Sequence, residues 1–196
     1  MELKNIKQEI QASIDTKSDI LNNEPLLGQI KNLATECISS LKSGGKIIFC
    51  GNGGSFADAQ HLSAEFTSRF MFDRPGLASL ALGTNSSAMT AIGNDYGYEN
   101  VFARELESIA GPNDLLIAIT TSGNSLNILK ALEAAKEIKL PLVVFSGNSD
   151  GKLPRGINTL NIPSSNTARI QECHILIGHI LCGLIEASLF KNKDYL

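Results

Sequence analysis

Apolar residues recur along the first 43 residues of this chain with the spacing of a helix. The four-residue spacing is kept by Ile6, Ile10, Ile14, Leu33, Cys37 and Leu41. Four residues make about one helical turn, so each of these sets lies on one face of a helix. The segment Asn22-Asn23-Glu24-Pro25 interrupts the repeat with residues that favour turns and helix starts. We therefore expect two helices over residues 3–43.

Beyond residue 43, short runs rich in β-branched and apolar residues alternate with longer helical patterns. The runs that predict strands cover residues 46–50, 77–82, 115–120, 142–145 and 159–162. The helical patterns cover residues 57–69, 86–92, 126–138 and, as a long last helix, about 168–190. This alternation is typical of a parallel sheet with crossover helices. Unbroken apolar runs such as Leu142-Val143-Val144-Phe145 predict strands covered on both faces. The expected fold class is α/β, with about five strands.

Length and composition limit the classes of protein to consider. A chain of 196 residues, with 43% hydrophobic and 19% charged residues, fits one globular domain. We expect a single domain over residues 1–196, made of a helical segment (1–43) and an α/β core (44–196). The net charge of −3 and the lack of a Lys/Arg cluster disfavour a nucleic-acid partner.

The sequence also suggests where the protein works. No apolar run approaches the roughly 20 residues that span a bilayer, and the first residues lack the apolar stretch of a signal peptide. A cytoplasmic protein with no membrane partner is therefore expected. Its four cysteines are scattered and lack structural-zinc spacing, so we expect free thiols and a metal site, if one exists, built from other ligands.

The turn Gly51-Asn52-Gly53-Gly54-Ser55 has the composition of an anion-binding turn between a strand and a helix. Its glycines allow a ligand to approach the backbone, and a Ser55 N-cap would leave amides facing a phosphate. It matches neither the dinucleotide fingerprint, since Phe56 stands where a glycine is required, nor a Walker loop. A tight capped turn without a ligand is the alternative.

A second turn, Thr120-Thr121-Ser122-Gly123-Asn124-Ser125, also joins a strand to a helix. Four hydroxyls, one glycine and a helix N-terminus offer neutral donors to a dianion. For this turn alone, a simple capped helix start without a ligand is the alternative. Two such turns at the carboxyl ends of strands of one sheet favour a shared binding cleft.

Histidines on two helices supply candidate chemistry. His61 and Glu65 are four residues apart, so both can face one ligand or metal, although such pairs are also common surface contacts. On the last helix, Gln171 and His179 are eight residues apart, about 12 Å along the axis. They scarcely reach one metal, so sharing it would require a distorted helix or two subunits. His174 faces elsewhere and is expected to be a packing or surface residue.

Together these motifs resemble the phosphoheptose isomerases, the sedoheptulose 7-phosphate isomerases of the sugar-isomerase (SIS) fold. The resemblance spans nearly the whole chain, and it rests on the order and spacing of the segments Cys50–Ser55, Asp58–His61 with Glu65, Gly93–Asp95, Thr121–Ser125, Ala168–Glu172 with His179, and Arg74-Pro75-Gly76. It implies a flavodoxin-like parallel sheet and a homotetramer with active sites at subunit interfaces. The implied reaction converts sedoheptulose 7-phosphate to D-glycero-D-manno-heptose 7-phosphate, the first step toward the heptose of bacterial surface polysaccharide such as lipopolysaccharide.

Site residues follow from the same resemblance, position by position. The implied zinc ligands, one ion per active site, are His61, Glu65, Gln171 and His179. The implied substrate-binding residues are Asn52, Gly53, Gly54, Glu65, Asn94, Asp95, Thr120, Thr121, Ser122, Ser125 and Gln171. Family members often have Ser at the position of Thr120, and some have Asp at the position of Ala168, whose carboxylate this chain lacks.

The implied chemistry suits these residue types. Moving a carbonyl from C2 to C1 takes a proton from one carbon, returns it to the next, and passes through a cis-enediol. Glu65 is the expected base at carbon and His179 the expected acid/base at the oxygens, while a metal would act as a Lewis acid. A nitrogen that binds zinc cannot also carry the shuttled proton, so the division of roles stays open.

A non-catalytic protein of the same fold, which associates with the replication initiator DnaA, is the competing interpretation. It shares the turns and the Ala168–Glu172 segment, but it lacks the histidine found here at position 179. A sugar-phosphate sensor would normally carry a separate DNA-binding domain, for which 196 residues leave no room. The sequence therefore favours the enzyme.

Overall fold

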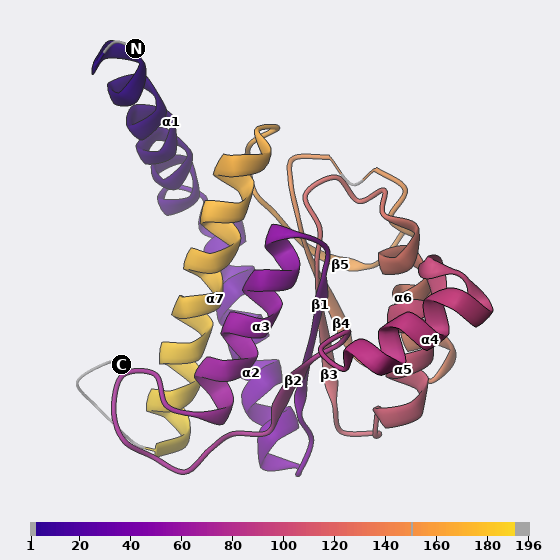
Figure 1. Cartoon of the computed structure of the whole chain (residues 1–196). Helices are drawn as coiled ribbons and strands as arrows, with labels where there is room; N and C mark the ends of the chain where they lie inside the picture. Colours follow the sequence, from indigo (N-terminus) through magenta and orange to yellow (C-terminus); the bar gives the residue numbers. More distant parts are fainter. Residues whose placement is uncertain (1–2, 150, 191–196) are drawn as a thin grey trace.

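The computed structural model of the chain describes residues 3–149 and 151–190 (Figure 1). The ends of the expected 1–196 domain thus lie outside the described residues. The helical elements are α1 (Leu3–Leu21), α2 (Glu24–Lys42), α3 (Gly54–Thr67), α4 (Ser86–Tyr96), the 3-10 helix η1 (Tyr98–Asn100), α5 (Val101–Ile109), α6 (Leu126–Glu137) and α7 (Thr167–Phe190). The strands are β1 (Ile47–Gly51), β2 (Ser79–Ala81), β3 (Leu115–Ile119), β4 (Leu142–Ser146) and β5 (Asn158–Asn161).

The described residues form one five-stranded sheet with the order β2-β1-β3-β4-β5, and every neighbouring pair is parallel. This is the flavodoxin-like strand order. The pairing of β1 with β3 runs in register from Ile47 opposite Leu115 to Gly51 opposite Ile119. The predicted fold class is confirmed.

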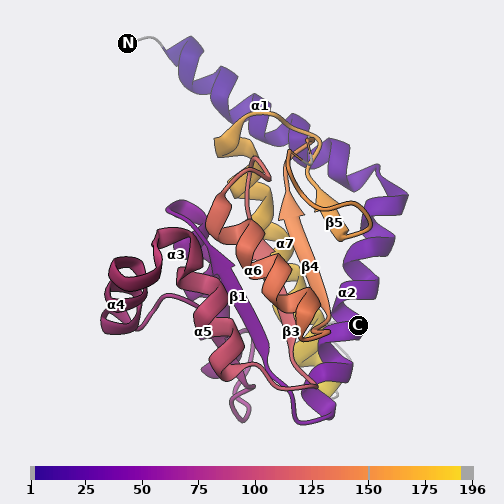
Figure 2. The ribbon, with the colours of Figure 1, turned by 90° about the vertical axis from the view of Figure 1, so that its right-hand side faces the viewer.

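Helices cover both faces of the sheet, as two views at right angles show (Figures 1 and 2). On one face, Phe49, Ile117 and Phe145 pack in a core with side chains of α2, α3 and α7. On the other, Ile48 and Leu116 pack with side chains of α5 and α6. Successive residues of a strand point to opposite faces, so strands covered on both sides are apolar throughout.

The connections around β1 and β3 create the place where a ligand is expected. These strands are neighbours, but α3, which follows β1, packs on one face of the sheet, and α6, which follows β3, packs on the other. The two chain segments diverge where they leave the carboxyl ends of the strands. A divergence of this kind is the topological switch point at which open α/β sheets bind ligands.

The helical start of the chain is confirmed, and its interruption has a simple cause. Asn23 caps α2 by accepting a hydrogen bond from the amide of Leu26 at 3.1 Å, and Pro25 lies in the first turn. α1 extends away from the sheet (Figure 2) and leaves a stripe of apolar side chains 49–75% exposed, namely Leu3, Ile6, Ile10 and Ile14.

The long last helix corrects one expectation from the sequence. Within the described residues, α7 is long and apolar enough to cross a membrane by length and composition alone. More than half of its most apolar window is buried inside the protein, and side chains of α2 and α3 share its core. Buried helices at the centre of a fold have the same length and composition. The scan for apolar runs missed this segment because Glu172, His174 and Glu186 interrupt it.

Some other elements differ from those expected. α3 begins at Gly54 rather than residue 57, because glycines concealed its first turn. β2 is reduced to Ser79–Ala81 at the sheet edge. The short helix α5 was not predicted, although Val101, Phe102 and Leu106 form a buried face on it. All four cysteines are buried free thiols, as expected.

Candidate active site

The turn Gly51–Ser55 provides no side-chain cap for the start of α3. Gly53 precedes the helix with a φ of 56°, a left-handed conformation that glycine adopts without strain. Ser55 is therefore not the N-cap that the sequence suggested. It lies in the first turn of α3 and is buried. A glycine cap has no side chain to accept a hydrogen bond. The amides of Ser55, Phe56 and Ala57 donate to carbonyls of the turn, so among the described residues it is the Gly54 amide that stays available to an anion.

The second turn leads into α6 in a similar way. Ser125 occupies the N-cap position, but its side chain makes no capping hydrogen bond to the described residues. The hydroxyl of Thr120 accepts a hydrogen bond from the amide of Gly123 at 3.2 Å, which shapes the turn. Two helix N-termini without a side-chain cap among the described residues thus lie at the ends of β1 and β3.

A small polar hollow lies between these turns. It has a volume of about 80 Å³, and it is lined by Asn52, Ser55, Ile119, Thr120, Thr121, Ser122, Ser125 and Gln171. None of these lining side chains is charged. The hollow suits a compact anion such as a phosphate group rather than a whole sugar, and its donors are hydroxyls, amides and helix N-termini.

Asn127, which sequence reasoning missed, positions the side chain of Asn52. Each of the two amides donates a hydrogen bond to the other at 2.8 Å, and the Asn127 oxygen also accepts from the amide of Ile128 at 3.0 Å. Asn127 is buried in the first turn of α6. The pair ties the first turn to the helix that follows the second turn. No sequence pattern links two asparagines 75 residues apart.

Gln171 belongs to the anion end of the site. A Cβ atom at Gly54 would lie 2.7 Å from the Gln171 side-chain nitrogen, so the amide of Gln171 lies directly against the start of α3. α7 is α-helical from residue 167 to 190, which excludes the distortion that would bring Gln171 to His179. About 12 Å of helix axis separates the two residues. The structure therefore places Gln171 in the hollow and apart from the histidines.

His61, Glu65 and His179 converge on one point. The Nε2 atoms of His61 and His179 are 2.8 Å apart, and His61 Nε2 is 3.3 Å from Oε1 of Glu65. One ligand atom from each residue lies within 4.8 Å of the others. This geometry arises because α3 supplies two of the residues at a four-residue spacing and α7 supplies the third. Two imidazoles and a carboxylate are a donor set typical of catalytic zinc, with coordination positions left for a substrate.

Burial and charge tune the neighbours of this cluster. The pKa of His179 is lowered, first by burial and then by the charge of His61, while Glu65 raises it. Asp58 lies one turn before His61, and burial raises its pKa. One Asp58 oxygen is buried without a hydrogen-bond partner among the described residues.

Three residues lie away from both groups. Asn94 and Asp95 are exposed near the end of α4, where the Asn94 amide donates to the Asp95 carboxylate at 2.7 Å. They do not line the hollow. His174, expected to be a packing or surface residue, is buried. Its ring packs against Phe145 with centroids 5.7 Å apart, and Nε2 lies 3.2 Å from the carbonyl oxygen of Ser146.

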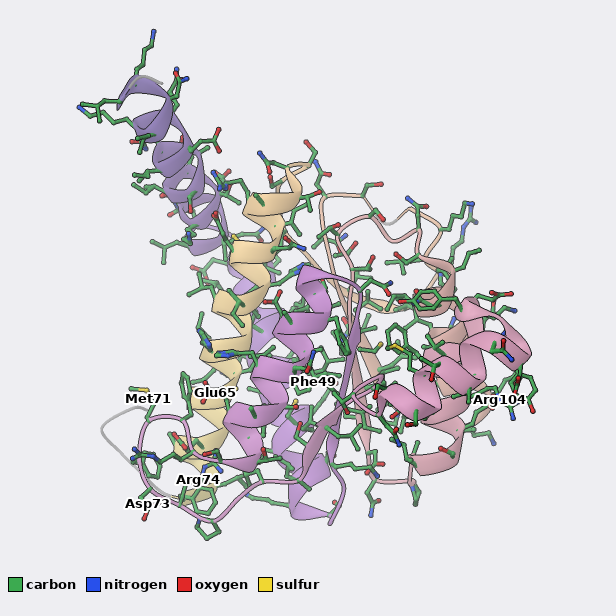
Figure 3. All side chains as sticks on the ribbon, in the orientation of Figure 1. Phe49, Glu65, Met71, Asp73, Arg74 and Arg104 are labelled. Atoms are coloured by element: carbon green, nitrogen blue, oxygen red, sulfur yellow. The ribbon has the colours of Figure 1, made fainter. Side chains whose placement is uncertain are left out.

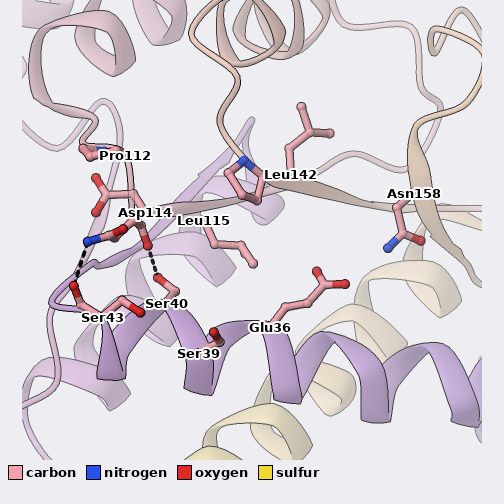
Figure 4. A pocket seen from close by; sticks show the side chains of 11 residues that line it. Glu36, Ser39, Ser40, Ser43, Pro112, Asp114, Leu115, Leu142 and Asn158 are labelled. Atoms are coloured by element: carbon pink, nitrogen blue, oxygen red, sulfur yellow. Dashed lines mark hydrogen bonds between the residues drawn. The ribbon is translucent and has the colours of Figure 1, made fainter.

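A larger hollow of about 530 Å³ lies at the opposite edge of the sheet, between α2 and the starts of β3, β4 and β5 (Figure 4). Its polar groups bond mainly to one another. Ser40 donates to the Asn113 carbonyl at 2.6 Å, and the Asn113 amide donates to the Ser43 carbonyl at 2.7 Å. Asp114 is paired with Lys46. This hollow is thus remote from the convergent donors, and its side chains do not suggest chemistry.

Comparison with known proteins agrees with this geometry. The model of the SIS domain family matches residues 11–147. The phosphoheptose isomerase of Aneurinibacillus thermoaerophilus is 52% identical over 96% of both chains, and phosphoheptose isomerase 2 of Campylobacter jejuni is 51% identical over 94% of this chain and 92% of its own. The solved phosphoheptose isomerase of Francisella tularensis superposes with a TM-score of 0.87 at 36% identity, covering 95% of this chain and 98% of that one. The enzyme from Neisseria gonorrhoeae gives 0.85 at 38%, covering 93% and 98%.

Proposed function

This chain belongs to the phosphoheptose isomerases of the SIS domain family, and we propose that it interconverts sedoheptulose 7-phosphate and D-glycero-D-manno-heptose 7-phosphate through a cis-enediol. It is an isomerase. The observation that carries the proposal is the convergence of His61, Glu65 and His179, two of them on the same helix that begins at the anion hollow. Binding and chemistry thereby share one rigid element.

The phosphate is proposed to bind at the two turns. Its donors would be the hydroxyls and amides of the hollow together with the starts of α3 and α6, from the residues Asn52, Gly53, Gly54, Thr120, Thr121, Ser122, Ser125 and Gln171. Neutral donors and helix dipoles stabilise a dianion without a lysine. The tie between Asn52 and Asn127 keeps the first turn in position.

The spacing of the site suits a seven-carbon chain. From Gly54 to His61 the axis of α3 advances about 10 Å, and from Gln171 to His179 the axis of α7 advances about 12 Å. An extended heptose chain, with bonds of about 1.5 Å, spans roughly 9 Å from the phosphate to the carbonyl carbons. A sugar anchored at the hollow would therefore present C1 and C2 to the histidine and glutamate side chains.

Glu65 is proposed as the base at carbon and His179 as the acid/base at oxygen. Glu65 removes the proton from the carbon next to the carbonyl and returns it to the neighbouring carbon, so the net change is an internal transfer of two hydrogens. His179 moves the proton between the two oxygens. Its lowered pKa favours the neutral ring, which can accept a proton near neutral pH.

Zinc fits the same residues, one ion per active site. The opposed Nε2 atoms of His61 and His179 and the carboxylate of Glu65 form a compact donor set, and bound zinc would polarise the carbonyl and stabilise the enediolate as a Lewis acid. A histidine nitrogen has one lone pair, so His179 Nε2 either binds the metal or carries the proton. A Gln171 ligand would have to come from a second subunit, since the residue in the same chain lies at the hollow.

A homotetramer with sites at subunit interfaces is part of the proposal. The exposed apolar stripe of α1 is the kind of surface that a second copy would cover. Asn94 and Asp95 are retained as sugar-binding groups, and their exposure on α4 suits contact with a sugar held partly by another subunit. We place the reaction in the cytoplasm, as the first step toward the heptose of a bacterial surface polysaccharide.

Incubation of the purified protein with sedoheptulose 7-phosphate, with and without chelator, tests the activity. The aldose should form, and chelator should remove most of the turnover. A lack of product under both conditions would contradict the isomerase. Glu65→Gln keeps the shape of the side chain but removes the base, so turnover should fall at least 1,000-fold, about 4 kcal/mol in barrier, with the fold intact. Activity within a few-fold of the original would exclude Glu65 from the reaction.

The alternative of a binding partner for DnaA makes a different prediction for the same assay. Such a protein would give no aldose with or without zinc. The isomerases reported above and the presence of His179 in the convergent cluster both favour the enzyme.

A further inference from the structure

The loop between α3 and β2 carries a buried ion pair that the proposed reaction does not use. Arg74, part of the Arg74-Pro75-Gly76 motif, donates from Nε to Oε1 of Glu186 on α7 at 2.8 Å. The two side chains are only 2% and 0% exposed. A buried pair costs free energy to desolvate, so its presence calls for a specific structural reason.

Arg74 fastens the loop to the end of α3. Its guanidinium donates to the carbonyl oxygens of Glu65 at 2.8 Å, Phe66 at 2.7 Å and Ser68 at 2.9 Å. These carbonyls lack partners within the helix, and a cation is favoured at this end of the helix dipole. Figure 3 shows Arg74 on the loop below Glu65. The guanidinium therefore fixes the backbone of the proposed base.

Glu186 fastens the next part of the loop to α7. Its Oε1 accepts from the amide of Phe70 at 3.0 Å, and its Oε2 accepts from the amide of Met71 at 2.7 Å. With the bond from Arg74, these contacts satisfy both carboxylate oxygens. These three hydrogen bonds anchor the loop to α7.

The anchored loop places Phe70 on His179. The two rings are stacked, with centroids 5.5 Å apart and planes inclined by 23°. A second ring against His179 is that of His61, which meets it edge-on with centroids 5.1 Å apart. Glu186 lies seven residues after His179, on the same side of α7 two turns further along. A contact between rings restricts rotation of the imidazole and keeps its Nε2 atom directed at His61 and Glu65.

We propose that Phe70, held by the Arg74–Glu186 pair, is a positioning residue for His179. The loop fixes the reactive imidazole from one side while Arg74 fixes the backbone of Glu65 from below. This inference rests on the proposed function only for its kinetic consequence. The orientation of the ring and its affinity for a metal do not depend on which sugar is the substrate.

The test compares Phe70→Leu with Phe70→Tyr. Leucine keeps an apolar side chain, although a smaller one, and loses the flat ring. Tyrosine retains the ring, so only the first change should disturb His179. Zinc affinity, measured by competition with a chromogenic chelator, should fall about 10-fold or more in Phe70→Leu, as is typical when support of a ligand is lost. It should stay within two-fold in Phe70→Tyr. Met71→Leu, at an exposed side chain of the same loop, is the matched control.

Histidine ring resonances give a readout without metal or substrate. The chain has three histidines, so substitution of His61 and His174 assigns the signals. The His179 ring proton should shift when the stacked ring is removed in Phe70→Leu and should remain in place in Met71→Leu. In Glu186→Gln, the side-chain amide faces the Met71 amide, donor against donor, so the His179 signal should shift in the same direction if the variant folds.

The kinetic pattern separates positioning from a general loss of stability. For Phe70→Leu, kcat should fall about 10-fold with KM within two-fold. Unchanged zinc affinity and an unchanged His179 signal in folded Phe70→Leu would overturn the proposal. Inactivity of the unsubstituted protein toward sedoheptulose 7-phosphate would contradict the proposed function. Zinc affinity and the His179 signal in the Phe70 variants would still decide whether Phe70 positions His179.

Discussion

Stability should depend on pH through His174, which the proposed reaction does not use. Its Nε2–H donates to the Ser146 carbonyl, which assigns the proton to that nitrogen in the neutral ring. Nδ1 is buried without a hydrogen-bond partner among the described residues. Protonation would place a charge and a second N–H in an apolar environment next to Phe145. Burial accordingly lowers the pKa of His174 from its ordinary 6.5 to about 4.

The sign follows from proton binding in the two states. Between pH 6.5 and pH 4 the unfolded chain binds a proton at His174 and the folded chain does not, so the stability of the fold decreases as the pH falls. With these two pKa values the loss is about 2 kcal/mol at pH 5 and about 3 kcal/mol at pH 4, relative to pH 7. Below pH 4 the contribution levels off, because both states are then protonated.

Urea unfolding of the original protein and of His174→Gln at a series of pH values measures this effect. Glutamine can still donate to the Ser146 carbonyl but does not titrate, so the difference between the two curves isolates the histidine. Protein concentration must be constant, because assembly would also shift stability. The curves should diverge by about 2 kcal/mol between pH 7 and pH 5. Curves that stay parallel over that range would refute the assignment of a buried neutral imidazole.

Three other predictions concern the packing of the site and its metal. Gly178→Ala puts a Cβ atom 2.5 Å from the buried Leu62 side chain, so the free energy of unfolding should fall by about 1–2 kcal/mol, although alanine has the better helix propensity. Equal or greater stability in a urea titration would contradict a tight contact of α3 with α7. Asn127→Ala removes both hydrogen bonds to the Asn52 amide, so KM for the sugar phosphate should rise about 10-fold, roughly 1.4 kcal/mol. An unchanged KM in steady-state kinetics would exclude a role for this pair. Removal of metal by chelator should abolish turnover, and added zinc should restore it. Full activity of protein that elemental analysis shows to be metal-free would exclude a catalytic role for a metal.

The architecture was predictable because it depends on patterns that are local in sequence. Apolar runs for β1, β3 and β4, alternating with helical periods, lead to a parallel sheet whatever the details of the loops. Errors occurred where local signals were weak or ambiguous. Gly53 and Gly54 concealed the start of α3. The apolar length of α7 was hidden by Glu172, His174 and Glu186, and the structure buries the last two of these side chains.

The candidate site was only partly predictable for a related reason. His61 and Glu65 share a face through helical spacing, which sequence reveals, but the arrival of His179 beside them depends on packing between α3 and α7. The partners Arg74 and Glu186 are 112 residues apart, and no periodicity connects them. The motif around Arg74 was noticed, whereas the carboxylate that it binds required the structure.

The dependence of the histidine cluster on α7 also affects how the protein folds. His61 and His179 are 118 residues apart. In the sequence, β1 precedes α3, and β3 and β4 lie between α3 and α7. Contacts of such high sequence separation form late, because closing the long loop costs entropy before any contact compensates for it. A chain with its sheet formed and α7 undocked therefore has only the two donors of α3, His61 and Glu65, in place. A metal ion that binds all three side chains would bind the docked state more tightly. By mass action, zinc would then act as a folding ligand that draws α7 onto α3 and slows its release.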